Sequence, residues 1–171
     1  MARHQGPVLV DTNVIIECWR TASWKALAGG YRIETVQMCE AETQTGALNR
    51  PPEDRIDPRV LRETLNAVHP VGGAEKARAL LANDLMPALD PGEMMLWAHA
   101  LTRTDAWILC GPDKASLRVG LRLGFRERLV SLERLLADVG FRAKIALRNN
   151  YTQKWLELAL AQLGQLEARQ P

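Results

Sequence analysis

Short apolar runs alternate with amphipathic segments along most of this chain, and that alternation limits the folds it can adopt. We expect buried strands at residues 7–11 (PVLVD), 31–38 (YRIETVQM), 106–112 (AWILCGP) and 128–132 (RLVSL), and a short strand or turn at 68–73. Helical patterns fill most of the sequence between them. Strands that alternate with helices predict an α/β fold with a parallel sheet covered on both faces.

The expected helices begin and end at recognisable signals. The first covers residues 13–30 and breaks near Thr21–Ser23, where Ser23 is placed to cap the second piece. Residues 49–58 (NRPPEDRIDP) form a loop because turn-favouring residues dominate them. Further helices are expected at 39–48, 59–67, 73–85, 91–103 and 113–124.

Residues 151–170, near the end of the chain, carry an amphipathic helical pattern. Its apolar positions are Trp155, Leu156, Leu158, Leu160 and Leu163. We expect one domain over residues 1–140 and a helical extension over 141–171 that packs on or beside it.

The charge is distributed unevenly, although its sum is small. The chain has 171 residues and a net charge of +2, which argues neither for nor against nucleic acid. Residues 114–150, however, carry nine Lys or Arg and only three acids. Such a stretch could face phosphates, or it could be an ordinary solvated helix surface. The basic residues are Lys114, Arg118, Arg122, Arg126, Arg128, Arg134, Arg142, Lys144 and Arg148.

The cysteines and histidines give no metal-binding spacing. Three cysteines lie far apart in apolar surroundings, which favours free thiols and a reducing compartment. The three histidines are close neither to the cysteines nor to one another in sequence, so we expect no zinc site. We also expect no membrane span and no signal peptide, and therefore a cytoplasmic protein.

Acidic residues follow several of the predicted strands. Asp11 ends the first strand, Glu42 lies one turn into the next helix with Glu40 nearby, and Asp113 follows the strand at 106–112. Glu93 begins the helix at 91–103. Chemistry in parallel α/β sheets gathers at the carboxyl ends of strands, so these four carboxylates could converge. A divalent cation such as Mg²⁺ or Mn²⁺ would relieve their repulsion and could activate water.

Each acid also has a purely local explanation. Asp90, Pro91 and Glu93 fit a capping box. Asp113 could cap its helix, and Glu42 could be an exposed helical residue. Asp11 is the hardest to explain locally, because Thr12 or Asn13 could cap the following helix and leave its carboxylate free.

Four segments together resemble the PIN domain family of metal-dependent nucleases. VLVDTNVII is similar to the family's first strand, which ends in Asp-Thr/Ser-Asn/Ser. ETQTG is similar to the segment of the second acid and selects Glu42 over Glu40. LDPGEMMLWAHAL resembles the helix of the third acid, Glu93, and ILCGPDKASL resembles the segment of the last acid, Asp113. The match covers about residues 7–135.

The resemblance implies a three-layer α/β/α sandwich on a mainly parallel sheet, and Mg²⁺- or Mn²⁺-dependent hydrolysis of phosphodiester bonds, usually in RNA. Asp11 would bind the metal directly, and Asp113 directly or through water. Glu42 and Glu93 would complete the coordination or act on the attacking water. No second acid follows Asp113 in KASLRVG, where many relatives have one.

The resemblance also suggests residues for the substrate. Thr12 or Asn13 would hold a ligand or phosphate, and Lys114 could meet a phosphate. Arg118, Arg122 and the rest of the basic stretch would guide the nucleic-acid backbone.

Other functions remain open at this point. A haloacid-dehalogenase-type phosphohydrolase also begins with a strand that ends in Asp, but it requires Asp where this chain has Asn13. A PIN-like module could bind RNA or protein without catalysis. Among nucleases, both a toxin with an antitoxin partner, as a homo-oligomer such as a dimer, and a housekeeping or defence enzyme fit the sequence.

Overall fold

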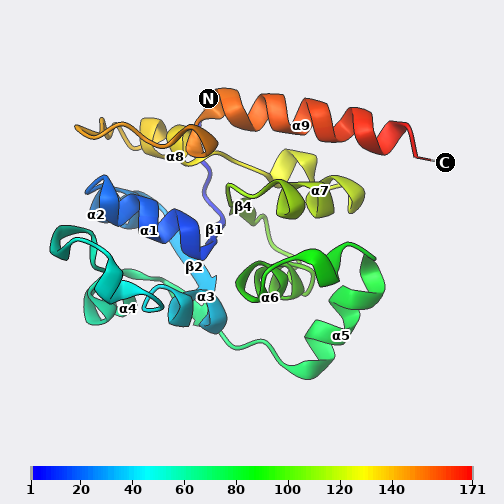
Figure 1. Cartoon of the computed structure of the whole chain (residues 1–171), viewed down its shortest axis with the longest axis horizontal. Helices are drawn as coiled ribbons and strands as arrows, with labels where there is room; N and C mark the ends of the chain where they lie inside the picture. The colour runs from blue at the N-terminus through cyan, green and yellow to red at the C-terminus, as the bar shows by residue number, and fades with distance from the viewer. Residues whose placement is uncertain (1, 171) are drawn as a thin grey trace.

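A four-stranded sheet forms the centre of the computed structural model, which describes residues 2–170 (Figure 1). Its strands are β1 (Pro7–Val10), β2 (Arg32–Val36), β3 (Ala67–His69) and β4 (Ile108–Cys110). They lie in the order β3-β2-β1-β4, and each neighbouring pair is parallel. The predicted α/β/α class with a parallel sheet is confirmed. The sheet is wholly parallel in the described residues.

The α-helices cover both faces of this sheet. Val8 and Val10 lie in one apolar cluster with residues of α1, α2, α4 and α8. Leu9 points the other way, into a cluster with residues of α6, α7 and α9, because successive strand residues face opposite sides. The bounds are α1 Thr12–Arg20, α2 Trp24–Gly30, α3 Gln37–Glu42, α4 Pro58–Thr64, α5 Gly73–Ala82, α6 Pro91–Ala100, α7 Lys114–Arg122, α8 Leu132–Asp138 and α9 Gln153–Ala168.

Two local predictions are wrong in detail. Ser23 occupies the N-cap position of α2, but its side chain accepts no amide there. Its hydroxyl instead contacts the hydroxyl of Thr21 at 3.0 Å. The break between α1 and α2 is made by Ala22, whose φ of 55° lies in the left-handed region. A tight backbone reversal, and not a side-chain cap, separates these helices.

The predicted last strand at 128–132 is also wrong. Leu129 makes only an isolated bridge with Leu109, and the Val130 amide donates to the Leu109 carbonyl at 3.0 Å. The ladder stops there because Ser131 already caps α8 by accepting from the Arg134 amide at 3.1 Å. The start of a helix thus ends the pairing before a strand can form.

The C-terminal helix α9 packs against α7 and α8, and it runs along the outside of the molecule in Figure 1. Leu156, Ala159 and Leu160 are buried in the same cluster as Leu9. Leu158, which the sequence pattern assigned to the apolar face, is 54% exposed. No helix among the described residues is long and apolar enough to cross a membrane.

Replacement of Leu156 by Ala tests whether α9 is part of the folded unit. Leu156 is buried, so we expect the free energy of unfolding to fall by about 2–4 kcal/mol in denaturant titrations. Leu158→Ala is the matched control on the same helix, and it should change this free energy by less than about 0.5 kcal/mol. Equal effects of the two variants would contradict the docking of α9.

Candidate functional site

Asp11 connects the central strand β1 to the start of α1. Its backbone amide donates to the Cys110 carbonyl at 3.2 Å, which fixes it beside β4. Its side chain is the N-cap of α1, since Oδ2 accepts from the Asn13 amide at 3.2 Å. The expectation that Thr12 or Asn13 would cap this helix is therefore wrong. Asp11 is only 2% exposed, so its carboxylate is buried with one oxygen used for capping.

Glu42, on the last turn of α3, lies beside the start of α1. The Thr12 hydroxyl donates to Glu42 Oε2 at 2.9 Å. Gly92 at the start of α6 lies against the same carboxylate, because a Cβ at this position would stand only 2.3 Å from Oε2. Three elements, α1, α3 and α6, therefore meet at Glu42.

Glu93 lies on the first turn of α6 and is 5% exposed. Asp90 caps this helix by accepting from the Glu93 amide at 2.8 Å, as the capping pattern predicted. The pKa of Glu93 is raised to about 8, first by burial and then by the charges of Asp113, Asp11 and Asp90. The charges of these three other acids therefore reach the Glu93 carboxyl.

Asp113 is the N-cap of α7 and accepts from the amides of Ala115 at 2.7 Å and Ser116 at 3.3 Å. The capping explanation for Asp113 is thus confirmed. Its charge is nevertheless the largest single contribution from another acid to the raised pKa of Glu93. Asp113 both caps a helix and belongs to the acidic group.

Among residues 2–170, the buried carboxyls of the acidic group form no ion pair with a base. The pKa of Asp11 is raised to about 6, mainly by burial, with further contributions from Asp90 and Glu42. No Lys or Arg appears among the main causes for Asp11 or Glu93. Buried, unpaired carboxylates of this kind are costly. A bound cation would remove that cost.

The chemistry of the group fits Mg²⁺ or Mn²⁺, which prefer carboxylate oxygens. Among the described residues, no set of three of these acids places its carboxylate oxygens within 4.8 Å of one another. An ion here would contact one or two carboxylates directly, and the other acids would act through water. That arrangement is usual for Mg²⁺, which keeps much of its hydration shell.

Cys39 is a site neighbour that sequence reasoning missed. Its thiol lies 3.4 Å from the Gly92 carbonyl oxygen and 4.0 Å from Asp11 Oδ1, and it is fully buried. Burial and the charge of Asp11 raise the pKa of this thiol to about 12. The available signal was its position three residues before Glu42, one turn earlier on the same helix. A neutral thiol adds no charge to the acids.

The predicted substrate-binding residues have different surroundings. Thr12 is buried and binds Glu42, whereas Asn13 is exposed. Arg118 and Arg122 both pair with Glu167 of α9, and Arg122 also pairs with Asp84 at 2.5 Å.

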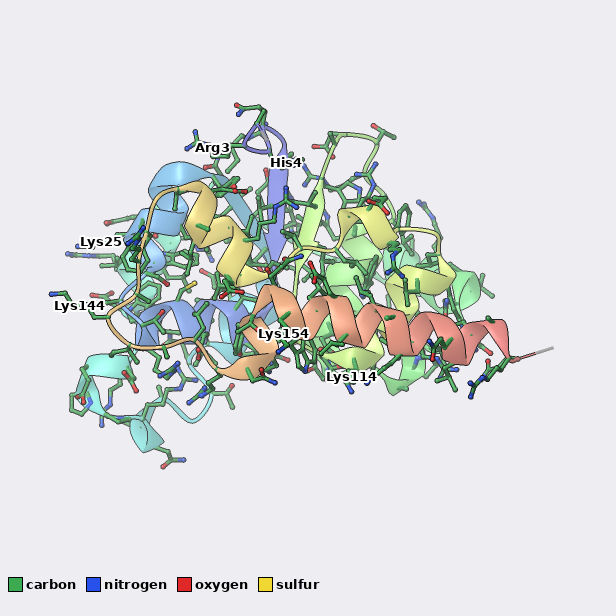
Figure 2. All side chains as sticks on the ribbon, turned by 90° about the horizontal axis from the view of Figure 1, so that it is seen from above. Arg3, His4, Lys25, Lys114, Lys144 and Lys154 are labelled. Carbon is green, nitrogen blue, oxygen red and sulfur yellow. The ribbon has the colours of Figure 1, made fainter. Side chains whose placement is uncertain are left out.

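Lys114 remains exposed beside α9, with Nζ 3.5 Å from Gln162 Oε1 (Figure 2). Of the predicted basic contacts, its ammonium group is therefore freer than the two guanidinium groups.

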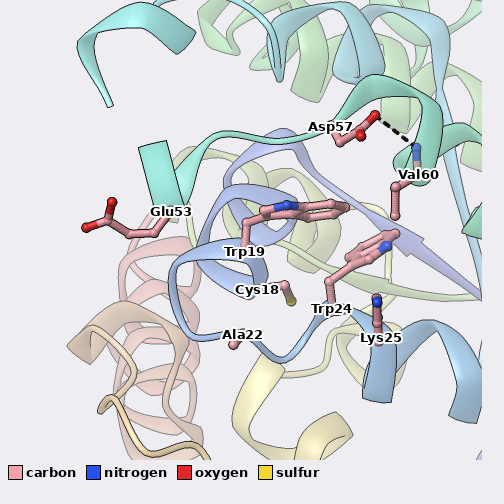
Figure 3. A pocket seen from close by; sticks show the side chains of 8 residues that line it. All are labelled: Cys18, Trp19, Ala22, Trp24, Lys25, Glu53, Asp57 and Val60. Atoms are coloured by element: carbon pink, nitrogen blue, oxygen red, sulfur yellow. Dashed lines mark hydrogen bonds between the residues drawn. The ribbon is translucent and has the colours of Figure 1, made fainter. Parts of the chain in front are cut away.

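A separate cavity lies between α1, α2 and the segment before α4 (Figure 3). Its volume is about 340 Å³, and the rings of Trp19 and Trp24 form much of its wall. These two rings pack with their centroids 5.3 Å apart. None of the four predicted acids lines this cavity. It is distinct from the acidic group.

No protein-family model matches the chain, and no curated protein matches it either. The structure shows an α/β fold with a four-stranded parallel sheet. The resemblance to PIN domains remains a prediction from the four sequence segments.

The raised pKa values predict an unusual pH dependence of stability. Asp11 and Glu93 hold protons more tightly in the folded chain than in the unfolded chain. Between about pH 4 and pH 8 the unfolded chain loses these protons first, so the contribution of these two acids to the free energy of unfolding falls as pH rises. The lowered pKa of His99 acts in the opposite direction below about pH 6.5, so the effect of Glu93 is clearest above that pH. In metal-free buffer, thermal unfolding should show a smaller decline with pH for Glu93→Gln than for the unmodified chain.

The exposed Glu127 provides the control for this measurement. Glu127→Gln removes the same charge away from the acidic group and should keep the original dependence on pH. Parallel curves for Glu93→Gln and the unmodified chain would contradict the raised pKa of Glu93.

Proposed function

We propose that this protein is a metal-dependent nuclease of the PIN type that hydrolyses phosphodiester bonds in RNA. The observation that carries the proposal is the group of acids that Asp11, Glu42, Glu93 and Asp113 form around the carboxyl end of β1. They come from four separate segments, and the buried members lack a neutralising base. The sequence resemblance at the same four positions supports this assignment.

Each residue of the group would have its own role in the reaction. Asp11 and Asp113 would hold Mg²⁺ or Mn²⁺, which supplies Lewis-acid stabilisation of charge on a phosphoryl group. Without a cation the pKa of Glu93 is raised to about 8, so Glu93 would lose its proton as a cation binds and would then accept a proton from the attacking water. Glu42 is held by the Thr12 hydroxyl and would orient that water. The exposed Lys114 would contact a substrate phosphate.

Cleavage of a mixed RNA pool tests the proposal directly. We expect cleavage by the unmodified chain with Mg²⁺ or Mn²⁺ and none with EDTA. Asp11→Asn should lose at least about 100-fold in rate, because it keeps the size of the side chain but removes a charged ligand. Its fold is checked by circular dichroism.

Asp54→Asn is the matched control, since it makes the same chemical change outside the acidic group and should keep full activity. An equal rate in Asp11→Asn would contradict the assignment of the metal ligand. The absence of cleavage by a folded chain under every condition would contradict the nuclease and favour a binding module.

The ion pairs of Glu167 lead to a second test of the proposed RNA surface. Glu167 engages both Arg118 and Arg122. Glu167→Gln should free part of their charge, so RNA should bind more tightly and with a steeper dependence on salt. Binding can be measured by fluorescence anisotropy with Asp11→Asn as background, which prevents cleavage.

Glu157→Gln is the control, because Glu157 lies on the same helix but contacts Gln153 and neither arginine. It should leave the affinity and the salt dependence nearly unchanged. Identical binding by the two variants would show that Arg118 and Arg122 do not contribute to the RNA surface.

A further inference from the structure

A second group of metal-ligating side chains lies away from the four acids. Glu34 on β2, His69 at the end of β3 and His99 on α6 place one ligand atom each within 4.8 Å of one another. Glu34 and His99 are buried, and His69 is half-buried. The two imidazole rings stack with centroids 4.0 Å apart. We expected no zinc site because the histidines are far apart in sequence, and that spacing does not reveal that the fold brings these three residues together.

The three ligand atoms surround one cationic nitrogen. Arg103 Nη1 lies 2.6 Å from Glu34 Oε2, 3.0 Å from His99 Nε2 and 3.4 Å from His69 Nε2. The polar atoms of all three side chains therefore point toward the same position. That position already holds positive charge, supplied by a guanidinium.

The donor set suits a transition metal. Two imidazoles and one carboxylate bind Zn²⁺ and similar ions, whereas Mg²⁺ prefers oxygen ligands. His99 Nε2 accepts a hydrogen bond from Arg103 if it is unprotonated, which is the form that binds metals.

An unpaired oxygen lies close to the group. Glu75 on α5 is near enough for its charge to act on His99. Its Oε2 is buried and has no hydrogen-bond partner among residues 2–170. Such orphaned oxygens are uncommon in folded proteins. A divalent ion at the position of Arg103 Nη1 would increase the positive charge near this carboxylate.

Arg103 must move for an ion to occupy the position of its Nη1. It lies just after the end of α6, and the other side of its guanidinium binds Asp105 through Nε and Nη2. The Arg103 side chain is 13% exposed and the Asp105 side chain is 44% exposed, so the pair lies between the buried group and the surface. Because the guanidinium is planar, Nη1 leaves the group when Arg103 and Asp105 move outward together.

We propose that Glu34, His69 and His99 bind a transition-metal ion of the Zn²⁺ type, which takes the place of Arg103 Nη1. The exchange replaces the single positive charge of Arg103 by the two charges of the ion. It breaks the hydrogen bonds of Arg103 to Glu34 and His99, and it also breaks the 2.8 Å contact between His69 Nε2 and Glu34 Oε2. Arg103 and Asp105 move outward as a pair. This site is independent of the proposed nuclease function, because it shares no ligand with the four acids.

Metal content of the full chain tests the proposal. The measurement uses Asp11→Asn as background and excess Mg²⁺, so that the acids contribute little. After incubation with Zn²⁺ and desalting, mass spectrometry of the metal should give one Zn²⁺ per chain. Co²⁺ in place of Zn²⁺ should give the visible absorption of a low-coordinate nitrogen and oxygen site.

Single substitutions identify the ligands. His99→Gln and His69→Gln should each weaken Zn²⁺ binding by more than about 100-fold, beyond the usual effect of an outer-sphere change. His4→Gln removes the remaining histidine and should bind Zn²⁺ like the background chain. Arg103→Met removes the competing cation and should tighten binding by about 10-fold to 100-fold.

Two results would overturn the proposal. One is the absence of bound Zn²⁺ in both the background chain and Arg103→Met, which would make the group a closed network of ion pairs. The other is Zn²⁺ retention by His69→Gln equal to that of His4→Gln. His69 is half-buried, so its variant carries the test if His99→Gln does not fold, as judged by circular dichroism.

Discussion

The parallel pairing of β1 with both of its neighbours is the constraint on which the rest of the structure depends. β1 lies between β2 and β4, and Leu9 is paired with Glu34 on one side and Leu109 on the other. Parallel strands end at the same edge of a sheet, so the segments that follow β1, β2 and β4 start together there. Asp11, α3 with Glu42, and Asp113 are brought to one place by this arrangement. α6 completes the group because it packs across β1 and β2.

At this edge of the sheet, a carboxylate that caps a helix can also bind a second partner. Asp11, Asp90 and Asp113 each accept backbone amides at the start of a helix. A carboxylate has two oxygens and several lone pairs, so one helix cap leaves capacity for a further partner. The caps also fix the direction of each side chain. A local explanation of an acid therefore does not argue against a role in binding.

The sequence allowed the sheet and the acidic group to be predicted, because both follow from local patterns and from the rule that strand ends meet. The group of Glu34, His69 and His99 could not be predicted in this way. Its members belong to β2, β3 and α6, and only the register of β2 with β3 and the packing of α6 bring them together. The partners of Arg118 and Arg122 were equally hidden, since Glu167 lies about 45 residues later in the chain. The prediction of a strand at 128–132 was wrong because the helix cap at Ser131 competes with strand pairing.

The contact between Tyr151 and Asn13 has a consequence for the order of folding. The Tyr151 hydroxyl donates to the Asn13 carbonyl across 138 residues of sequence. Leu156 and Leu160 likewise join a cluster that contains Leu9. During synthesis, the strand and helix that flank Asp11 leave the ribosome well before these partners. Contacts so distant in sequence form slowly. The nascent chain therefore exposes the apolar surface beneath α9 until Leu156 and Leu160 have emerged, and during this time it is open to aggregation and to chaperones.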